Sequence, residues 1–418
     1  MSQELNVMEP VTKRRPKGWA RWRVLTLLMA VFVSLAGLRV ITGQDMLTDA
    51  GTVRTTLTFA VPIGLAGLGG LWAERAGIIN IGLEGMMIFG TWFGAYFAWS
   101  FDNPWIGLIA GTMGGMLGGL MHAVATVTFA VDHIVSGVAI NILALGAMRY
   151  MSILIYSDIP GAGAAQSPVA PSFPTLNVPW LPEALAPVAQ SGIFLVSDLA
   201  SLVIGLTTRM SALTLIAILL VPITYLVLWR STFGLRLRSV GENPDAAESL
   251  GVPVYTLKYI AVVVSGGLAG MGGVFLAIVA SQIYQEGQTG GRGYIGLAAM
   301  IFGNWRPGGL AMGAGLFGYT DALQVRGGGA AIHALLLLLA VVLLVVAVWQ
   351  VRKDRKGIAI AGFLTAVVLL LWYFSTDSLP RELATYSPHI ATLLVLSLAS
   401  QRLRAPAGVG KQWRASRS

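Results

Sequence analysis

The sequence predicts an all-α integral membrane protein, a polytopic bundle of about ten to twelve transmembrane helices. Of its 418 residues, 55% are hydrophobic and only 11% are charged, whereas soluble domains carry about 25% charged residues. Apolar runs of about 18 to 25 residues recur along the chain, the length that a helix needs to cross about 30 Å of hydrocarbon. The sequence lacks the short alternating segments that are typical of a β-barrel.

The transmembrane domain is expected to cover residues 24–401. Residues 1–23 are polar and basic, and the run that follows lacks a small-residue cleavage site, so it is predicted to be a retained span. Spans are expected at 24–42, 55–72, 78–98, 105–128, 134–156, 211–229, 257–280, 333–350, 358–374 and 384–401.

Two stretches do not fit simple spans. The proline-rich segment 157–210 is too long for a hairpin and is predicted to be an external excursion, with an apolar part at 193–206 on the surface. In 294–323, two short apolar runs flank GNWRPGG, and neither run spans comfortably alone. Because irregular backbone at membrane depth must be buried in protein or line a wet cavity, 294–323 is predicted to be a broken pair or a re-entrant hairpin.

Basic residues indicate the orientation. Most of the 28 lysines and arginines fall in 1–23, 230–257, the VRKDRK loop and the tail 402–418, and cytoplasmic loops carry such an excess. Both ends of the chain and the loop 230–257 are therefore expected in the cytoplasm. The net charge of +9 is then a topology signal, and nucleic acid is not an expected partner.

The most distinctive polar stretch is Ser231–Thr256, between two long apolar runs. Asn243 is a suitable N-cap, Pro244 suits the first helical position, and Gly251 suits a left-handed residue after the helix. The pattern predicts a two-turn helix over Pro244–Leu250. The stretch Ser231–Thr256 is either an ordered connecting loop or a surface that contacts a partner.

Sequence motifs for catalysis are missing. The chain has no GxxxxGK[ST], HExxH or GxSxG pattern, its four histidines show no ligand spacing, and it has no cysteine. We therefore expect no enzymatic activity, no ATP hydrolysis, and no metal or cofactor bound by this chain.

Three polar residues within predicted spans are candidates for a solute path: Asn80, Glu84 and Asn141. Asn80 and Glu84 are four residues apart, so a helix would place them on one face. A carboxylate in mid-bilayer costs about 3 kcal/mol and should face an interior or a cavity. The alternative is a structural carboxylate that caps a helix or pairs with Arg75.

Glycines spaced by four recur in the predicted spans and favour close approach of helix backbones within one bundle. The pairs are Gly90/Gly94, Gly111/Gly115, Gly115/Gly119, Gly266/Gly270 and Gly309/Gly313.

Four blocks carry a resemblance to a known family: ERAGIINIGLEGMMIFG (74–90), VDHIVSGVAINILALG (131–146), LRSVGENPDAAESLGV (237–252) and GRGYIGLAAMIFGNWRPGG (291–309). In this order they resemble permease subunits of ABC importers of the branched-chain amino acid/simple sugar/nucleoside class, and most closely the nucleoside (purine-type) branch. The resemblance implies that 230–257 is the cytoplasmic coupling loop, whose short helix docks into the partner ATPase. The positions that match the coupling pattern are Gly241, Glu242, Asn243, Pro244, Ala246, Ala247 and Gly251.

The resemblance also implies the partners. ATP and Mg²⁺ would be bound by a separate ATPase subunit, a second and homologous permease subunit would complete a heterodimer in membrane lipid, and an extracytoplasmic substrate-binding lipoprotein or protein would deliver the solute. The expected location is the cell membrane of a prokaryote. One departure from the family is an expected two-helix insertion at 332–374.

The competing hypothesis is an ion-coupled secondary transporter of a small polar solute. In it, the broken segment 294–323 would bind the solute and Glu84 would carry protons.

Overall fold

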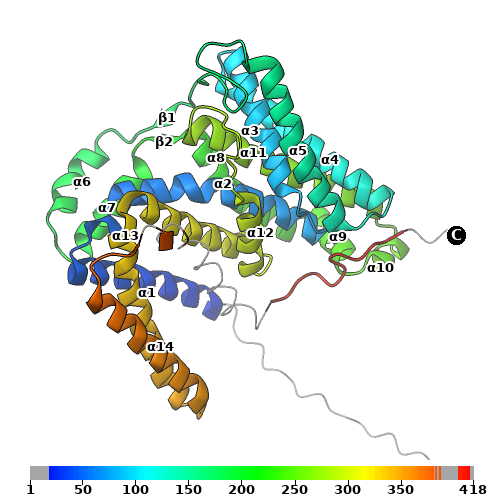
Figure 1. Ribbon diagram of the computed structural model, residues 1–418. Coiled ribbons are helices and arrows are strands. Elements are labelled where there is room, and N and C mark those ends of the chain that lie inside the picture. The colour runs from blue at the N-terminus through cyan, green and yellow to red at the C-terminus, as the bar shows by residue number, and fades with distance from the viewer. Residues whose placement is uncertain (1–17, 381, 384–385, 387–402, 415–418) are drawn as a thin grey trace, which may run out of the picture.

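The structure is a computed structural model and describes residues 18–380, 382–383, 386 and 403–414 (Figure 1). Most of the predicted basic tail 1–23, and all but Tyr386 of the predicted last span 384–401, lie outside the described residues.

Helices dominate the described residues, and seven of them are long and apolar enough to cross a membrane. The predicted all-α class is confirmed. The α-helices are α1 (Gly18–Thr42), α2 (Ala50–Arg75), α3 (Leu83–Ser100), α4 (Pro104–Ala123), α5 (His133–Tyr156), α6 (Leu181–Gln190), α7 (Val196–Thr207), α8 (Ala212–Arg230), α9 (Thr232–Glu242), α10 (Pro244–Ser249), α11 (Val254–Val274), α12 (Arg292–Phe302), α13 (Pro307–Val351) and α14 (Lys356–Ser375). A 3-10 turn (Asp45–Leu47) precedes α2, and π-helical turns (Val124–Thr128 and Phe275–Ala280) continue α4 and α11.

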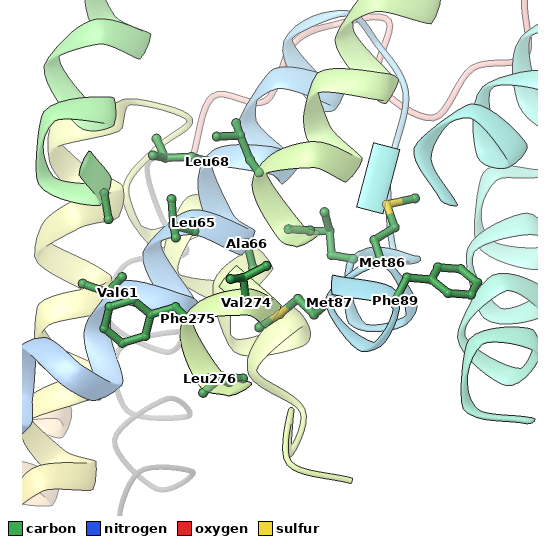
Figure 2. Close-up of a cluster of buried hydrophobic side chains, with 14 of the residues drawn as sticks. Val61, Leu65, Ala66, Leu68, Met86, Met87, Phe89, Val274, Phe275 and Leu276 are labelled. Carbon is green, nitrogen blue, oxygen red and sulfur yellow. The ribbon is translucent and has the colours of Figure 1, made fainter. Parts of the chain in front are cut away.

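The core lies where α2, α3, α4 and α11 meet. Figure 2 shows apolar side chains of α2, α3 and the end of α11 packed together. The backbones of α3, α4 and α11 approach closely at glycines: a Cβ added to Gly270 would lie 2.6 Å from the carbonyl oxygen of Gly111 and 2.8 Å from Cα of Gly115. The glycine pairs predicted for α3, α4 and α11 therefore pack helices within one chain.

The start of α3 differs from the prediction. We expected a span from residue 78, which would place Asn80 and Glu84 on one helix face, but α3 begins at Leu83 and Asn80 lies in the loop 76–82. The reason is Gly77, whose φ of +89° is left-handed and stops α2. Its N–H donates to the carbonyl of Glu74 at 3.0 Å.

Segment 157–210, which is predicted to be an external excursion, packs against the helices. Two-residue strands β1 (Thr175–Leu176) and β2 (Met210–Ser211) pair antiparallel, and α7 forms within the predicted apolar part. The carboxylate of Asp198 on α7 forms an ion pair with Arg39 of α1, with Oδ1 2.9 Å from Nε. The segment is therefore joined to the first span.

The predicted break within 294–323 is confirmed, but the second half is longer than expected. Helix α12 is short, and the turn 303–306 after it contains left-handed Asn304 and Trp305. The second half does not end near residue 323. It continues as α13 to Gly328, whose φ of +54° and ψ of −145° kink the helix, a region that only glycine readily adopts. The part of α13 before this kink is long enough to span a membrane.

Beyond the kink, α13 and α14 form a helical hairpin joined at residues 352–355. In Figure 1 this hairpin extends away from the other helices, and only 11% of the most apolar window of α14 is buried.

Candidate functional site

The candidate site is the face of the molecule that carries α10, which we name the α10 face. It comprises the loop 76–82, α9, α10, the turn 303–306 and the C-terminal segment 403–414, which contact one another. Arg75 at the end of α2 donates to the carbonyl of Trp305 at 2.6 Å, and the N–H of Gly410 donates to the carbonyl of Gly77 at 3.1 Å.

Helix α10 has the caps that its sequence predicts. Asn243 is extended, with φ of −151°, and its Oδ1 accepts from the N–H of Ala246 at 3.1 Å. Pro244 occupies the first helical position, and Gly251 is left-handed, with φ of +76°. The predicted helix Pro244–Leu250 is confirmed with its end at Ser249.

Gly241 and Glu242 serve contacts inside the chain. A Cβ on Gly241 would overlap the backbone carbonyl of Arg75, so only glycine allows α9 to lie this close to the end of α2. A carboxylate oxygen of Glu242 accepts from the N–H of Ala407 at 3.0 Å. Both residues therefore position α10.

The two alanines of α10 differ in exposure. Both match the coupling pattern, but Ala247 is only 2% exposed and packs among Val240, Val254 and Trp413. Ala246 is exposed. Ala247 is buried because Trp413, far along the chain, covers one side of α10.

Leu250 is a further residue of this surface that we did not predict. Its side chain is 84% exposed, the largest value among the exposed large apolar residues described. It lies beside Ala246 and Ser249, which are exposed as well. The available signal was an apolar residue in a polar loop, directly before a glycine that suits a left-handed conformation.

The three candidate path residues form hydrogen bonds that connect different helices. The carboxylate of Glu84 accepts from the N–H groups of Gly291 and Gly293, at 2.8 and 2.7 Å, at the N-terminus of α12. Discontinuous helices in membranes often direct such an end at an anion, and here the anion is an internal carboxylate. The geometry therefore favours the structural role of Glu84. Its carboxylate caps the start of α12 and does not pair with Arg75.

Asn141 and Asn80 bond in the same region. Oδ1 of Asn141 accepts from the N–H of Gly85 at 2.7 Å, and its Nδ2 donates to the hydroxyl of Tyr294 at 2.8 Å. Nδ2 of the fully buried Asn80 donates to the hydroxyl of Ser265 at 2.8 Å. These contacts connect the start of α3 with α5, α11 and α12, and they favour structural roles over contact with a solute.

Replacing Glu84 with alanine is expected to lower the thermal midpoint of the purified protein by about 5 °C or more, because two charge-assisted hydrogen bonds are lost and two N–H groups at the start of α12, one of them buried, lose their acceptor. Thermal unfolding in detergent measures this. Glu183→Ala, at an exposed carboxylate of α6, is the control and should leave the midpoint unchanged. An unchanged midpoint together with lost uptake would instead assign Glu84 to the solute path.

A polar cavity of about 220 Å³ lies near the start of α2, remote from the α10 face. Nε of Arg54 and Oγ1 of Thr208 are buried there without a hydrogen-bond partner among the described residues. The polar side chains that line it are Arg54, Thr58, Ser172, Thr175, Thr208, Arg209, Ser211, Thr214 and Gln282. The cavity can therefore hold a small molecule rich in hydrogen-bond acceptors. Within the part of the chain that the structure describes, no cluster of acidic or histidine side chains could hold a metal ion.

Comparison with known proteins gives a match to a protein family. Residues 52–348 match the family model described as "Branched-chain amino acid transport system / permease component". The chain is 38% identical to the guanosine ABC transporter permease protein NupQ of Bacillus subtilis, over 66% of this chain and 82% of that protein. It is 36% identical to the nucleoside ABC transporter permease protein NupC of Lactococcus lactis, over the same shares. It is 32% identical to the putative glucose ABC transporter permease protein TsgC13 of Haloferax volcanii, over 86% of this chain and 96% of that protein. No solved structure matches.

Proposed function

Because the chain belongs to the family of permease components of branched-chain amino acid transport systems, we propose that it is one membrane subunit of an ATP-driven importer of nucleosides. The nucleoside assignment is supported by the two relatives that share more than a third of their aligned residues with this chain. A second permease subunit, a separate ATPase that binds ATP and Mg²⁺, and an extracytoplasmic binding protein complete the importer.

The observation that carries this proposal is the exposed ridge on α10. Ala246, Ser249 and Leu250 are exposed on one side, whereas Ala247 anchors the other side in an apolar cluster. A short helix that is capped at both ends and packed along one side moves as a rigid body. Such a helix can therefore pass a movement of the ATPase on to the membrane helices, since α10 is joined to α9 and, through Val254, to α11.

In this proposal the α10 face is cytoplasmic, as the distribution of lysine and arginine predicts. The solute enters at the opposite face. The polar cavity beside Arg54 and Thr208 lies near the start of α2, and its hydrogen-bonding side chains are suited to ribose hydroxyls. Movement of α10 would open the path toward the cytoplasm.

Reconstitution tests the proposal. Proteoliposomes are prepared with both permease subunits and the ATPase, and the binding protein is added outside. They are expected to take up radiolabelled guanosine only when ATP is present in the lumen, on the side of the ATPase. Omission of the ATPase should reduce uptake to background, and excess unlabelled adenosine should compete. Uptake of glucose in place of guanosine would overturn the nucleoside assignment alone. Uptake by this chain without the ATPase, driven by a pH gradient, would overturn the ATP-driven mechanism.

A further inference from the structure

The C-terminal segment 403–414 runs alongside α10. Its backbone and its one tryptophan bond to acidic side chains at the start of this helix. The N–H of Ala407 donates to Glu242 at 3.0 Å, and Nε1 of Trp413 donates to Oδ1 of Asp245 at 2.6 Å. The segment thus follows the chain from the end of α9 into the first turn of α10.

Two glycines of the segment connect α10 with the rest of the α10 face. The N–H of Gly408 donates to the carbonyl of Gly241 at 2.9 Å, and that of Gly410 donates to the carbonyl of Gly77 at 3.1 Å. A side chain at Gly408 would collide with the Gly241 carbonyl, since a Cβ would lie 2.7 Å from it. The segment therefore ties the end of α9 to the loop between α2 and α3.

The ring of Trp413 holds the segment against the underside of α10. It is 8% exposed and belongs to the cluster that buries Ala247. The centroid of its ring is 5.2 Å from that of Tyr255, and Nζ of Lys258 lies 5.2 Å from the same centroid. The segment and α10 consequently form one packed unit.

The segment carries the cations of this unit, which lie on its outward side next to the exposed carboxylates of Glu242 and Asp245. Arg404, Lys411 and Arg414 are all exposed, and the segment contains no acidic residue. Because Trp413 faces inward, no large aromatic side chain of the segment is available to anchor it in a bilayer. A protein with acidic side chains is the partner that these cations fit.

We propose that the C-terminal segment and α10 together form a single docking surface for the ATPase subunit. Helix α10 supplies the apolar ridge at Leu250, and the segment supplies cations that pair with acidic side chains of that subunit. The proposal rests on the proposed function and adds to it a second contact element at the end of the chain. Charges at the rim of such a surface act mainly on the association rate and on the salt dependence.

The test is the affinity of the purified ATPase subunit of the same transporter for the permease pair in nanodiscs. Lys411→Glu combined with Arg414→Glu is expected to weaken binding about tenfold and to reduce its dependence on salt. The matched control reverses Arg352 and Arg355, which are exposed in the loop between α13 and α14. This control should change the affinity less than about twofold.

A second pair of variants tests the attachment of the segment. Trp413→Ala removes both the ring and the donor to Asp245, so the cations lose their position and binding should weaken about as much as in the charge reversal. Trp413→Phe keeps a ring over Ala247 and loses only the donor, and its effect should be smaller. Equal binding by Trp413→Ala and the wild type would contradict the proposal.

The outcomes separate this proposal from the proposed function. If the wild-type pair binds no ATPase subunit, the proposed function fails. If Leu250→Asp abolishes binding but the reversal at 411 and 414 leaves the affinity and its salt dependence unchanged, the docking role of the segment alone is overturned. If the reversal changes only the requirement for anionic lipid in the nanodiscs, the cations face the membrane and the proposal is wrong.

Discussion

Replacing Leu250 with aspartate is expected to reduce ATP-dependent uptake to about 5% of wild type or less, because truncating a central interface anchor costs about 2 kcal/mol or more, which is roughly thirtyfold in affinity. The side chain is 84% exposed, so the change removes few contacts inside the chain. Folding and membrane insertion should be unaffected. Uptake by the reconstituted importer, with the amount of ATPase bound measured in parallel, provides the test.

Two controls make this prediction specific. Leu176→Asp makes the same chemical change at a half-exposed leucine of β1, remote from α10, and should leave ATPase binding unchanged. The two alanines of α10 provide the second comparison. Ala246→Glu should weaken docking without loss of thermal stability, whereas Ala247→Glu should lower stability because it places a carboxylate in the cluster around Trp413. Normal uptake by Leu250→Asp would show that α10 is not the docking element.

The caps of α10 could be predicted because capping is local. Asn243 and its first-turn partner are three residues apart, and Gly251 needs only its own conformation. The direction in which α10 faces was not predictable. It depends on Trp413, 168 residues from its partner Asp245, and no helical periodicity connects these two parts of the chain.

The polar residues near α3 show the same limit. A carboxylate inside a predicted span indicates that something must compensate its charge, and that expectation is met. The compensating groups are the N–H groups of Gly291 and Gly293, which are more than 200 residues distant from Glu84. The position of Asn80 could not be obtained from its spacing, because Gly77 ends α2 and leaves Asn80 outside the helix.

Hydrophobic length predicted most spans but not the course of the chain through 294–351. The turn 303–306 is followed by Pro307, which begins α13, and the pattern Gly327–Gly329 marks the kink. Composition alone does not show that helical backbone continues on both sides of that kink. The glycine pairs likewise predicted close packing, whereas the pairing of α4 with α11 required the three-dimensional structure.

Replacing Gly270 with leucine is expected to cause the largest loss of stability of any change considered for this protein. A Cβ at this position would lie 2.6 Å from the carbonyl oxygen of Gly111 and 2.8 Å from Cα of Gly115. Both neighbours are backbone, so no side-chain rotation relieves the contact, and α4 and α11 must separate. The penalty should reach or exceed the roughly 3 kcal/mol at the upper end of ordinary overpacking. Fluorescence-detected size-exclusion chromatography after a heat challenge would show little folded protein.

The matched control is Gly146→Leu on α5, where the added Cβ meets no atom within 4 Å and the folded fraction should equal that of the wild type. A folded, transport-competent Gly270→Leu protein would show that α4 and α11 do not pack at these glycines.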